Sequence, residues 1–474
     1  MSEAGASGWA IWEWLQVVER ELLLFTLFWF IIGMFDELAV DGIWFWLRLV
    51  QGKRTDVVPA HLVQSREAVG LTGRIAVFIP AWQEADVIGT TIRHMLSVWT
   101  EADYRIYVGC YANDSATIAA AVASAGQDPR LRLVIHDSQG PTTKADCLNR
   151  LYSALCDDEA RLHMRFRGVI LQDSEDMVHP LALGAIDRAL GEVDFVQLPV
   201  HPEFPKGSRW VSGHYCDEFT ELHAKAMVVR DALGAGLPAA GVGCGFGRAM
   251  LDHIGGVRRA RGELGPFAAE CLTEDYELGM LIARGGGASQ FLRLRAPDGE
   301  LIATRSYFPA CLPDAVRQKT RWIHGISLQS WERLGWTRGF CETWMVLRDR
   351  RGPLTALVLA SAYLLLILEA ITSLAGKGLA VDALPPFVQG LVGLGLAGFV
   401  WRAGMRAIFT AREYGAAQGF LSVLRIPVAN IITIMAGRRA FWAYLRSLRG
   451  IRPPWEKTEH HEHPARLVTA RVPA

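Results

Sequence analysis

Apolar residues form an uninterrupted run at positions 22–35 of the chain, and an aromatic stretch follows at 38–50. The first run is shorter than the roughly 20 residues that a membrane-spanning helix needs, so flanking turns must extend it. We expect a membrane anchor and then an interfacial helix, both within residues 1–55. Basic residues such as Arg48 and Lys53 favour a cytoplasmic position for the chain after this anchor. A buried pair of soluble helices is the alternative.

Short β-rich runs alternate with helical stretches between residues 74 and 200. This rhythm predicts an α/β domain whose sheet is mostly parallel and carries helices on both faces. We expect the domain to occupy residues 72–345 and its ligands to bind beyond the carboxyl ends of the strands. The expected strands are 75–80, 104–111, 131–136, 168–173 and 195–200.

Two further apolar runs, 353–368 and 384–401, predict a transmembrane hairpin within residues 352–404. Arginines come after the second run, which indicates a return to the cytoplasm. Residues 405–474 should then form a cytoplasmic part, with a basic amphipathic helix over 419–449 on the membrane surface. We expect the histidine-containing tract 460–463 to be a solvated tail.

Composition agrees with one globular domain attached to a few membrane helices, because 51% of the residues are hydrophobic and 21% are charged. Lysine plus arginine and aspartate plus glutamate number 49 each. The balanced charge gives no argument for a nucleic-acid partner, and none is expected.

Acidic residues stand where the predicted strands or loops end, at Glu84, Asp114, Asp275 and the run 173–176. A single aspartate at such a place often only caps a helix or starts a turn. The run Asp173-Ser174-Glu175-Asp176 packs three carboxylates together, however, and repulsion between them is costly without a cation. Carboxylate oxygens suit Mg²⁺ or Mn²⁺, with diphosphate oxygens completing the shell. An acid-rich helix start is the alternative.

The chain carries a series of motifs whose order is similar to that of processive family-two glycosyltransferases with the GT-A fold. This resemblance implies a Rossmann-like, mostly parallel sheet and transfer of a sugar from a nucleotide-sugar with inversion. The motifs are Ile79-Pro80-Ala81-Trp82-Gln83-Glu84, Asn113-Asp114, Lys144-Ala145-Asp146, Asp173-Ser174-Glu175-Asp176, Thr273-Glu274-Asp275 and Gln318-Lys319-Thr320-Arg321-Trp322.

The family pattern implies a role for each acidic motif. Pro80, Glu84 and Asp114 would hold the nucleobase and ribose. The carboxylates of the run 173–176 would bind Mg²⁺ or Mn²⁺, through Asp173 together with Glu175 or Asp176. Asp275 would be the general base, since an acceptor hydroxyl must lose its proton as it attacks the anomeric carbon.

Donor and acceptor contacts are expected from the remaining motifs. Gln318 and Arg321 would meet the donor, because a guanidinium is suited to phosphate oxygens. Lys144 would reach the diphosphate, although a lysine exposed at a helix start is the alternative. Trp322 is expected to stack on the acceptor sugar, and its alternative is an interfacial anchor.

A glycine-rich run at 241–247 lacks the lysine and hydroxyl of a phosphate-binding loop. It predicts instead a close approach of the backbone to donor or acceptor. Phe246 within the run is expected to contact the acceptor, as is Glu274.

Three features look like the phage-adsorption protein B type within this superfamily: the Asp-x-Glu-Asp form of the acidic motif, Asp36-Glu37 in the anchor, and the stretch Arg425-Ile426-Pro427-Val428-x-Asn430. The resemblance implies a bacterial inner-membrane enzyme that works with an outer-membrane partner to export a polysaccharide, and that serves phage adsorption. With about three spanning segments, export should need a partner or a dimer.

Members of this type often add a C-terminal domain that binds cyclic di-GMP, and Ala474 lies too early for one. Such control is therefore expected to be lost, supplied by another subunit, or mediated by the basic helix near Arg438 and Arg439. The donor is expected to be a UDP-hexose or UDP-N-acetylhexosamine, and the acceptor a growing glycan. Transfer of one sugar to a lipid phosphate carrier is one alternative. A non-catalytic scaffold of a surface-receptor complex is the other.

Overall fold

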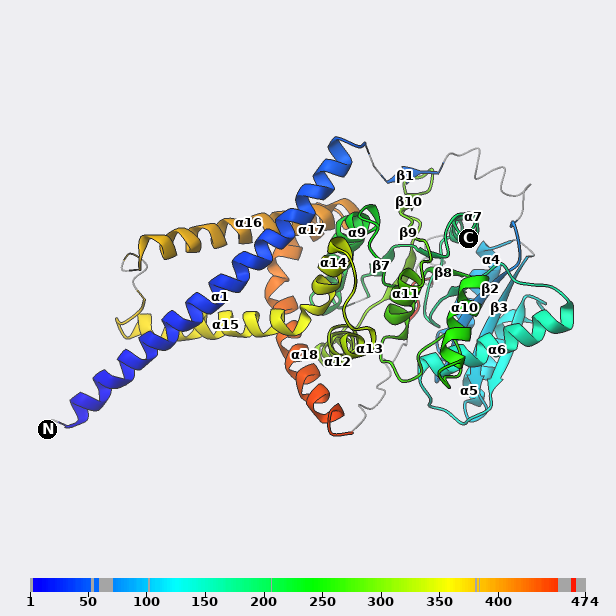
Figure 1. Ribbon diagram of the computed structural model, residues 1–474, viewed down its shortest axis with the longest axis horizontal. Coiled ribbons are helices and arrows are strands. Elements are labelled where there is room, and N and C mark those ends of the chain that lie inside the picture. The colour runs from blue at the N-terminus through cyan, green and yellow to red at the C-terminus, as the bar shows by residue number, and fades with distance from the viewer. Residues whose placement is uncertain are drawn as a thin grey trace.

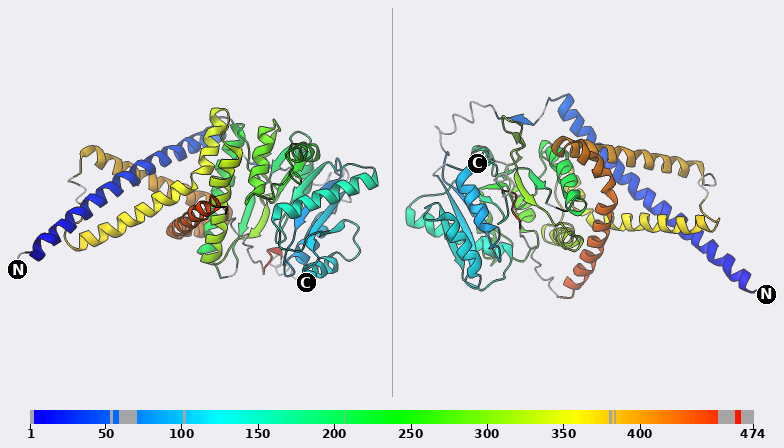
Figure 2. Two further views of the ribbon diagram at one scale, coloured as in Figure 1. Left: turned by 60° about the horizontal axis from the view of Figure 1, so that its bottom comes forward. Right: turned by 180° about the vertical axis from the view of Figure 1, so that it is seen from behind.

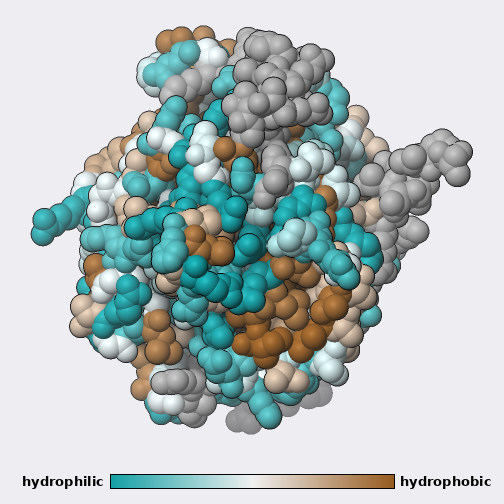
Figure 3. Space-filling model, turned by 90° about the vertical axis from the view of Figure 1, so that its right-hand side faces the viewer, coloured by the Kyte–Doolittle hydropathy of each residue, from teal (hydrophilic) through white to brown (hydrophobic). Residues whose placement is uncertain are grey.

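The computed structural model describes residues 3–52, 55–58, 71–100, 103–205, 207–379, 382, 384–450 and 462–465. Long helices gather at one end of the molecule and an α/β domain forms the other (Figure 1). The face of the α/β domain farthest from the long helices is covered mainly by polar residues, with some apolar ones among them (Figure 3). This division agrees with one end in lipid and the other in water.

The central sheet has, within the described ranges, seven strands in the order β4-β3-β2-β5-β8-β6-β9. Strands β4, β3, β2 and β5 are parallel to one another, and β8 runs antiparallel between β5 and β6. The mostly parallel sheet is therefore confirmed. Its strands are β2 (Ile75–Pro80), β3 (Tyr104–Tyr111), β4 (Leu131–His136), β5 (Gly168–Leu171), β6 (Phe195–Gln197), β8 (Cys244–Gly247) and β9 (Ser289–Phe291).

The expected strand 195–200 is wrong as a single element. Its first half is β6, whereas Val200 begins β7 (Val200–Glu203), which pairs with β11 (Thr304–Tyr307) outside the central sheet. Pro199 lies between the two and has no N–H for a ladder, which explains the change of partner. A second small pair joins β1 (Asp56–Val57) to β10 (Leu294–Arg295).

Alternating side chains of the strands fill two hydrophobic cores. In β2, Ala76 and Phe78 face one core, whereas Ile75, Val77 and Ile79 face the other. Both faces of the sheet are thus covered, as a parallel sheet requires. One face carries α4 (Ile88–Val98), α5 (Ser115–Ala125) and α7 (Ala182–Ala189). The other carries α6 (Lys144–Leu162), α9 (Met227–Ala232), α10 (Arg248–Arg259) and α11 (Glu274–Arg284).

A group of shorter helices lies between the sheet and the long helices (Figure 1). It includes the π-helical turns η1 and η2, a form that often marks functional sites. The group comprises α8 (Val211–Glu221), η1 (Leu222–Ala226), α12 (Leu312–Trp322), η2 (Ile323–Gln329), α13 (Ser330–Leu334) and α14 (Phe340–Arg350).

Among the described residues, three helices are long and apolar enough to cross a membrane: α1 (Glu3–Leu49), α15 (Gly352–Leu374) and α16 (Pro386–Tyr414). They lie side by side and project away from the α/β domain (Figures 1 and 2). The anchor and interfacial stretches expected near the N-terminus are one continuous helix, which corrects the prediction of two. Asp36 and Glu37 do not break α1, because Arg348 and Arg351 pair with both of them.

The expected amphipathic helix 419–449 is also wrong as one element. The chain forms α17 (Ala416–Leu424) and α18 (Ile426–Ser447), bent by 50° at Arg425. Pro427 explains the break, because it lacks an N–H and clashes with the preceding turn. Taken together as one bent span, α17 and α18 are long and apolar enough to cross a membrane as well. Ile432, Ala436 and Ala440 are buried, so α18 packs on protein along its middle.

Candidate active site

A cavity of about 570 Å³ begins at the carboxyl ends of β2 and β5 and continues towards α14 and the start of α15. Most of the residues singled out in the sequence line it, although they come from five separate segments. They are Pro80, Glu84, Lys144, Asp173, Glu175, Asp176, Glu274, Asp275, Gln318, Arg321 and Trp322.

The acid loop, residues 172–177, comes after β5 and folds back on itself. The backbone N–H of Asp173 donates to Oδ2 of Asp176 at 2.7 Å, and the N–H of Asp176 donates to the carbonyl of Asp173 at 3.3 Å. Burial, and then the charges of Asp173 and Glu175, raise the pKa of Asp176 well above its usual value. The negative charge of the loop is therefore larger than the positive charge of the side chains around it can neutralise.

Lys144 stands at the start of α6, where Thr143 caps the helix by accepting from the N–H of Asp146. Its Nζ lies 2.5 Å from Oδ1 of Asp173. Burial lowers the pKa of Lys144, but the carboxylates of Asp173, Glu274 and Asp275 raise it overall. Lys144 is thus a half-buried, charged ammonium among carboxylates, and the alternative of a lysine merely exposed at a helix start is wrong.

Glu274 and Asp275 occupy the first turn of α11, where a helix favours negative charge. Burial, and then the charge of Asp275, raise the pKa of Glu274 to about 7. Burial also raises the pKa of Asp275, against the opposing effect of Lys144. A carboxylate with a raised pKa is a stronger base, which suits proton removal from a hydroxyl.

The glycine-rich run brings the backbone close to Asp275. Gly241 has φ +77°, and a Cβ there would lie 2.3 Å from Oδ2 of Asp275 and 3.3 Å from Nζ of Lys144. A side chain at this position would displace the carboxylate. The backbone of the run thus closely approaches these two side chains, and its approach to a donor or acceptor stays a prediction.

Helix α12 contributes Gln318, Arg321 and Trp322 to the cavity wall. The Oε1 atom of Gln318 is buried and has no hydrogen-bond partner among the described residues, so it can accept from a bound molecule. The indole of Trp322 packs against Phe219 and Phe308, with ring centroids 6.1 and 6.4 Å away. These aromatic rings form an apolar wall opposite the carboxylates.

Two expected contacts do not reach the cavity. Phe246 is fully buried in β8 and stacks on Phe195 at 4.9 Å, so the prediction that it meets the acceptor is wrong. Asp114 caps α5 and accepts from the N–H of Gln83 at 2.6 Å. Asp114 is therefore placed to hold the loop that ends in Glu84, and it does not line the cavity.

Arg348 and Asp349 line the membrane-side end of the cavity and were not predicted from the sequence. Arg230 donates to both carboxylate oxygens of Asp349 at 2.8 and 2.9 Å, and Tyr276 donates to the same carboxylate. In the sequence, these two residues stand out only as charged residues directly before an apolar run. Charged residues at such a place are also typical of membrane anchoring, so the pattern does not distinguish an anchoring role from a role in the cavity.

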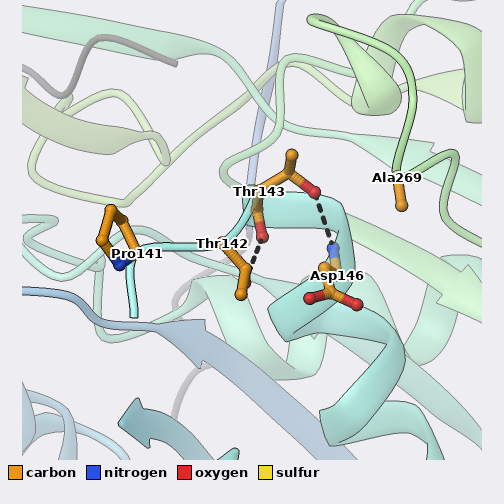
Figure 4. A pocket seen from close by; sticks show the side chains of 5 residues that line it. All are labelled: Pro141, Thr142, Thr143, Asp146 and Ala269. Atoms are coloured by element: carbon orange, nitrogen blue, oxygen red, sulfur yellow. Dashed lines mark hydrogen bonds between the residues drawn. The ribbon is translucent and has the colours of Figure 1, made fainter. Parts of the chain in front are cut away.

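A second pocket, of about 460 Å³, lies at the start of α6 (Figure 4). Thr142 and Thr143 line both cavities, and Pro141, Asp146 and Ala269 complete the second. The hydroxyl of Thr142 donates to the carbonyl of Thr143 at 3.4 Å. The two cavities therefore share the wall that also carries Lys144.

No group of three or more His, Cys, Asp or Glu side chains in the described ranges is arranged to hold a metal ion. Asp173 is paired with Lys144, and Asp176 caps the acid loop. The chemistry of the loop nevertheless fits a hard divalent cation, because its carboxylates are buried together and the pKa of Asp176 is raised. Diphosphate oxygens would have to complete such a site.

Residues 73–325 match the family described as glycosyltransferase like family 2. The chain belongs to this family. The chain is 31% identical over 471 residues to bacteriophage adsorption protein B of Escherichia coli strain K12, and equally to bacteriophage N4 adsorption protein B of Escherichia coli O157:H7. The matches cover 94% of this chain and 62% of the length of each relative.

A solved structure supports the GT-A fold of this chain. The mannosyltransferase PcManGT from Pyrobaculum calidifontis, in complex with GDP-Man and Mn²⁺, superposes with a TM-score of 0.53 at 16% identity. The match covers 90% of this chain and 99% of the other. At this identity the likeness concerns the fold alone.

Proposed function

We propose that this glycosyltransferase is an inverting, metal-dependent hexosyltransferase that uses a UDP-hexose or UDP-N-acetylhexosamine to extend a polysaccharide at the bacterial inner membrane. One observation carries the proposal: buried carboxylates from the acid loop and from α11 face one cavity around Lys144. The catalytic domain, residues 72–345, would be cytoplasmic.

Donor binding would begin at the ends of β2 and β5. Pro80 and Glu84 would contact the nucleobase and ribose, held by the contact of Asp114 with Gln83. Lys144, Gln318 and Arg321 would surround the diphosphate. Asp173 and Asp176, with Glu175 beside them, would hold Mg²⁺ or Mn²⁺, which would offset charge on the leaving diphosphate.

Asp275 would accept the proton of the acceptor hydroxyl as that oxygen attacks the anomeric carbon. Attack from the face opposite the leaving diphosphate inverts the configuration. Trp322 and Glu274 would orient the acceptor, the former by stacking and the latter by hydrogen bonding. Gly241 would hold Asp275 in place by contact.

The relatives' names support a part in phage adsorption. The product would be an exported polysaccharide. Export would need an outer-membrane partner. Control by cyclic di-GMP would come through another domain or subunit.

Transfer of one sugar to a lipid phosphate carrier is the second candidate. It is favoured by Arg351, which lines the cavity and directly precedes α15. A lipid-linked monosaccharide product would distinguish it from polymer extension.

The test is nucleotide release by detergent-purified protein with a panel of UDP- and GDP-sugars, with Mg²⁺, Mn²⁺ or chelator, beside Asp275→Asn. Release from a UDP-sugar that needs metal and disappears in the variant would support the proposal. Release from a GDP-sugar alone would overturn the donor assignment. No turnover with any donor, together with an intact cellular phenotype of Asp275→Asn, would favour the scaffold alternative.

A further inference from the structure

A short segment late in the chain, residues 462–465, packs against the acid loop instead of forming part of a solvated tail. The side chain of His463 is only 1% exposed, and its Nε2 lies 3.2 Å from the backbone carbonyl oxygen of Asp176. Ala465 is buried as well. Figure 2 shows this segment against the α/β domain, away from the end of α18.

The hydrogen bonds of His463 define which ring nitrogen carries the proton. Nδ1 accepts from the backbone N–H of Ala465 at 3.0 Å, so it must be unprotonated. In the neutral ring the proton then lies on Nε2, which donates to the carbonyl of Asp176. One nitrogen thus closes a turn of the segment and the other binds the acid loop.

Tyr307 in β11 lines the same cavity, and its pKa is raised by burial and then by the charges of Glu203 and Glu462. The charge of Glu462 therefore acts on the cavity wall, and the hydrogen bond of His463 to Asp176 is the direct contact of the segment with a residue of that wall.

Backbone carbonyls hold the acid loop at several points. The carbonyl of Asp173 accepts from Asp176, and that of Ser174 accepts from the hydroxyl of Thr91 at 2.5 Å. His463 adds a hold on the carbonyl of Asp176 itself. This peptide orients a carboxylate that the proposed function assigns to the metal.

We propose that His463 is a positioning residue, which fixes the peptide of Asp176 so that the acid loop keeps the carboxylate spacing needed for the donor and its metal. The proposal rests on the proposed function. Loss of a partner that orients a metal-binding carboxylate typically costs about 10- to 100-fold in metal affinity or activity.

Two variants of the chain distinguish the hydrogen bond of His463 to Asp176 from its hydrogen bond to Ala465. His463→Gln keeps a donor near the place of Nε2, whereas His463→Asn keeps an acceptor near the place of Nδ1 but is too short to reach Asp176. His253→Asn, at an exposed position on α10, is the matched control. For each protein, hydrogen exchange of the peptide 172–178 is measured without ligand. In a second experiment with the donor nucleotide-sugar, KM, kcat and the Mn²⁺ concentration that gives the half-maximal rate are measured.

We expect His463→Asn to speed exchange of the peptide 172–178 and to raise the half-maximal Mn²⁺ concentration or the donor KM by about 10-fold or more. His463→Gln should keep the exchange rate and the kinetic constants close to those of the wild type, and His253→Asn should leave the exchange rate and the kinetic constants unchanged. Equal exchange and equal kinetics in His463→Asn and wild type would overturn the proposal. So would equal losses in the Gln and Asn variants, which would indicate a structural role. If the wild type turns over no donor, the proposed function fails, and the exchange data still decide whether His463 holds the loop.

Discussion

Two clusters of buried charge lie at opposite ends of the same cavity, and they differ in balance. The catalytic cluster consists of Lys144, Asp173, Asp176, Glu274 and Asp275. The membrane-side cluster joins α1 to α8, η1, α14, α16 and the residue between α14 and α15, and it consists of Asp36, Glu37, Asp41, Glu221, Lys225, Arg348, Arg351 and Arg402.

Acids and bases are equal in number in the membrane-side cluster. Lys225 lies 2.5 Å from Asp41 and 2.6 Å from Glu221, and Arg402 lies 2.7 Å from Glu221. Each buried charge there has an opposite partner, as buried ion pairs require. In the catalytic cluster the carboxylates outnumber the cations that act on them, Lys144 and Arg321, and burial with crowding raises the pKa values of Asp176, Glu274 and Asp275.

An excess of buried carboxylates over cations is therefore a better sign of a binding site than burial alone. A balanced cluster needs no ligand, whereas a surplus of buried carboxylate is relieved by a cation or a proton. Substitutions in the catalytic cluster should therefore change activity most, and substitutions in the membrane-side cluster should change stability most.

Asp275→Asn should lower the rate of sugar transfer by about 10²- to 10⁴-fold, because the amide cannot accept the proton of the acceptor. The variant should be at least as stable as the wild type, since it removes one charge from a crowded cluster. Nucleotide release and thermal unfolding in detergent measure the two effects. Asp41→Asn in the membrane-side cluster is the comparison variant, and it should show the reverse pattern. Loss of stability in both variants with activity retained would contradict the distinction.

Lys225→Met should lower the free energy of unfolding by about 3–5 kcal/mol, because it leaves Asp41 and Glu221 buried without their shared cation. The rate per folded molecule should change little. Unfolding by denaturant in detergent is the measurement. Arg261→Met, at an exposed position, removes the same charge as a control and should be within about 0.5 kcal/mol of the wild type. A small effect of Lys225→Met would show that the cluster relaxes or takes up water.

Much of the fold could be predicted from the sequence where the pattern is local. The strands 75–80, 104–111 and 131–136 agree with the structure at both ends, because each is a short apolar run with clear breaks. Strand β8 could not be placed in this way. It is glycine-rich, and its position between β5 and β6 depends on pairing with residues far away in the sequence.

The same limit explains the errors at the site. Phe246 stands in a run that favours close approach, but the antiparallel insertion of β8 turns its side chain into the core. The tract 460–463 has the composition of a solvated tail, and the contact of His463 with Asp176 forms only when the chain folds. Charged motifs, by contrast, correctly predicted that Glu84, Asp173 and Asp176 share one cavity, because the carboxyl ends of neighbouring parallel strands meet at one edge of a sheet.

Gly241→Ala should lower kcat by up to about 100-fold, because its Cβ would displace the carboxylate of Asp275. The positive φ should also cost about 1–2 kcal/mol of stability. Gly262→Ala is the matched control, since Gly262 has φ +82° and open space around its Cβ position. It should lose similar stability and keep its activity. Equal kcat values in the two alanine variants would show that contact with Gly241 does not position Asp275.

Glu274→Gln should remove a pH dependence of stability. Burial and then the charge of Asp275 raise the pKa of Glu274 from 4.5 to about 7, against the opposing effects of Lys144 and Arg321. A raised carboxyl pKa means that stability present below pH 4.5 is lost as the pH rises through about 7, because the folded protein must then hold the ionised form. The variant cannot ionise, so its free energy of unfolding relative to the wild type should rise by about 1–3 kcal/mol between roughly pH 5 and pH 8. Denaturant unfolding across this range measures the effect, with Glu192→Gln at an exposed position as the control. Parallel pH curves for wild type and Glu274→Gln would mean that Glu274 is already compensated, as the carboxylates of the membrane-side cluster are.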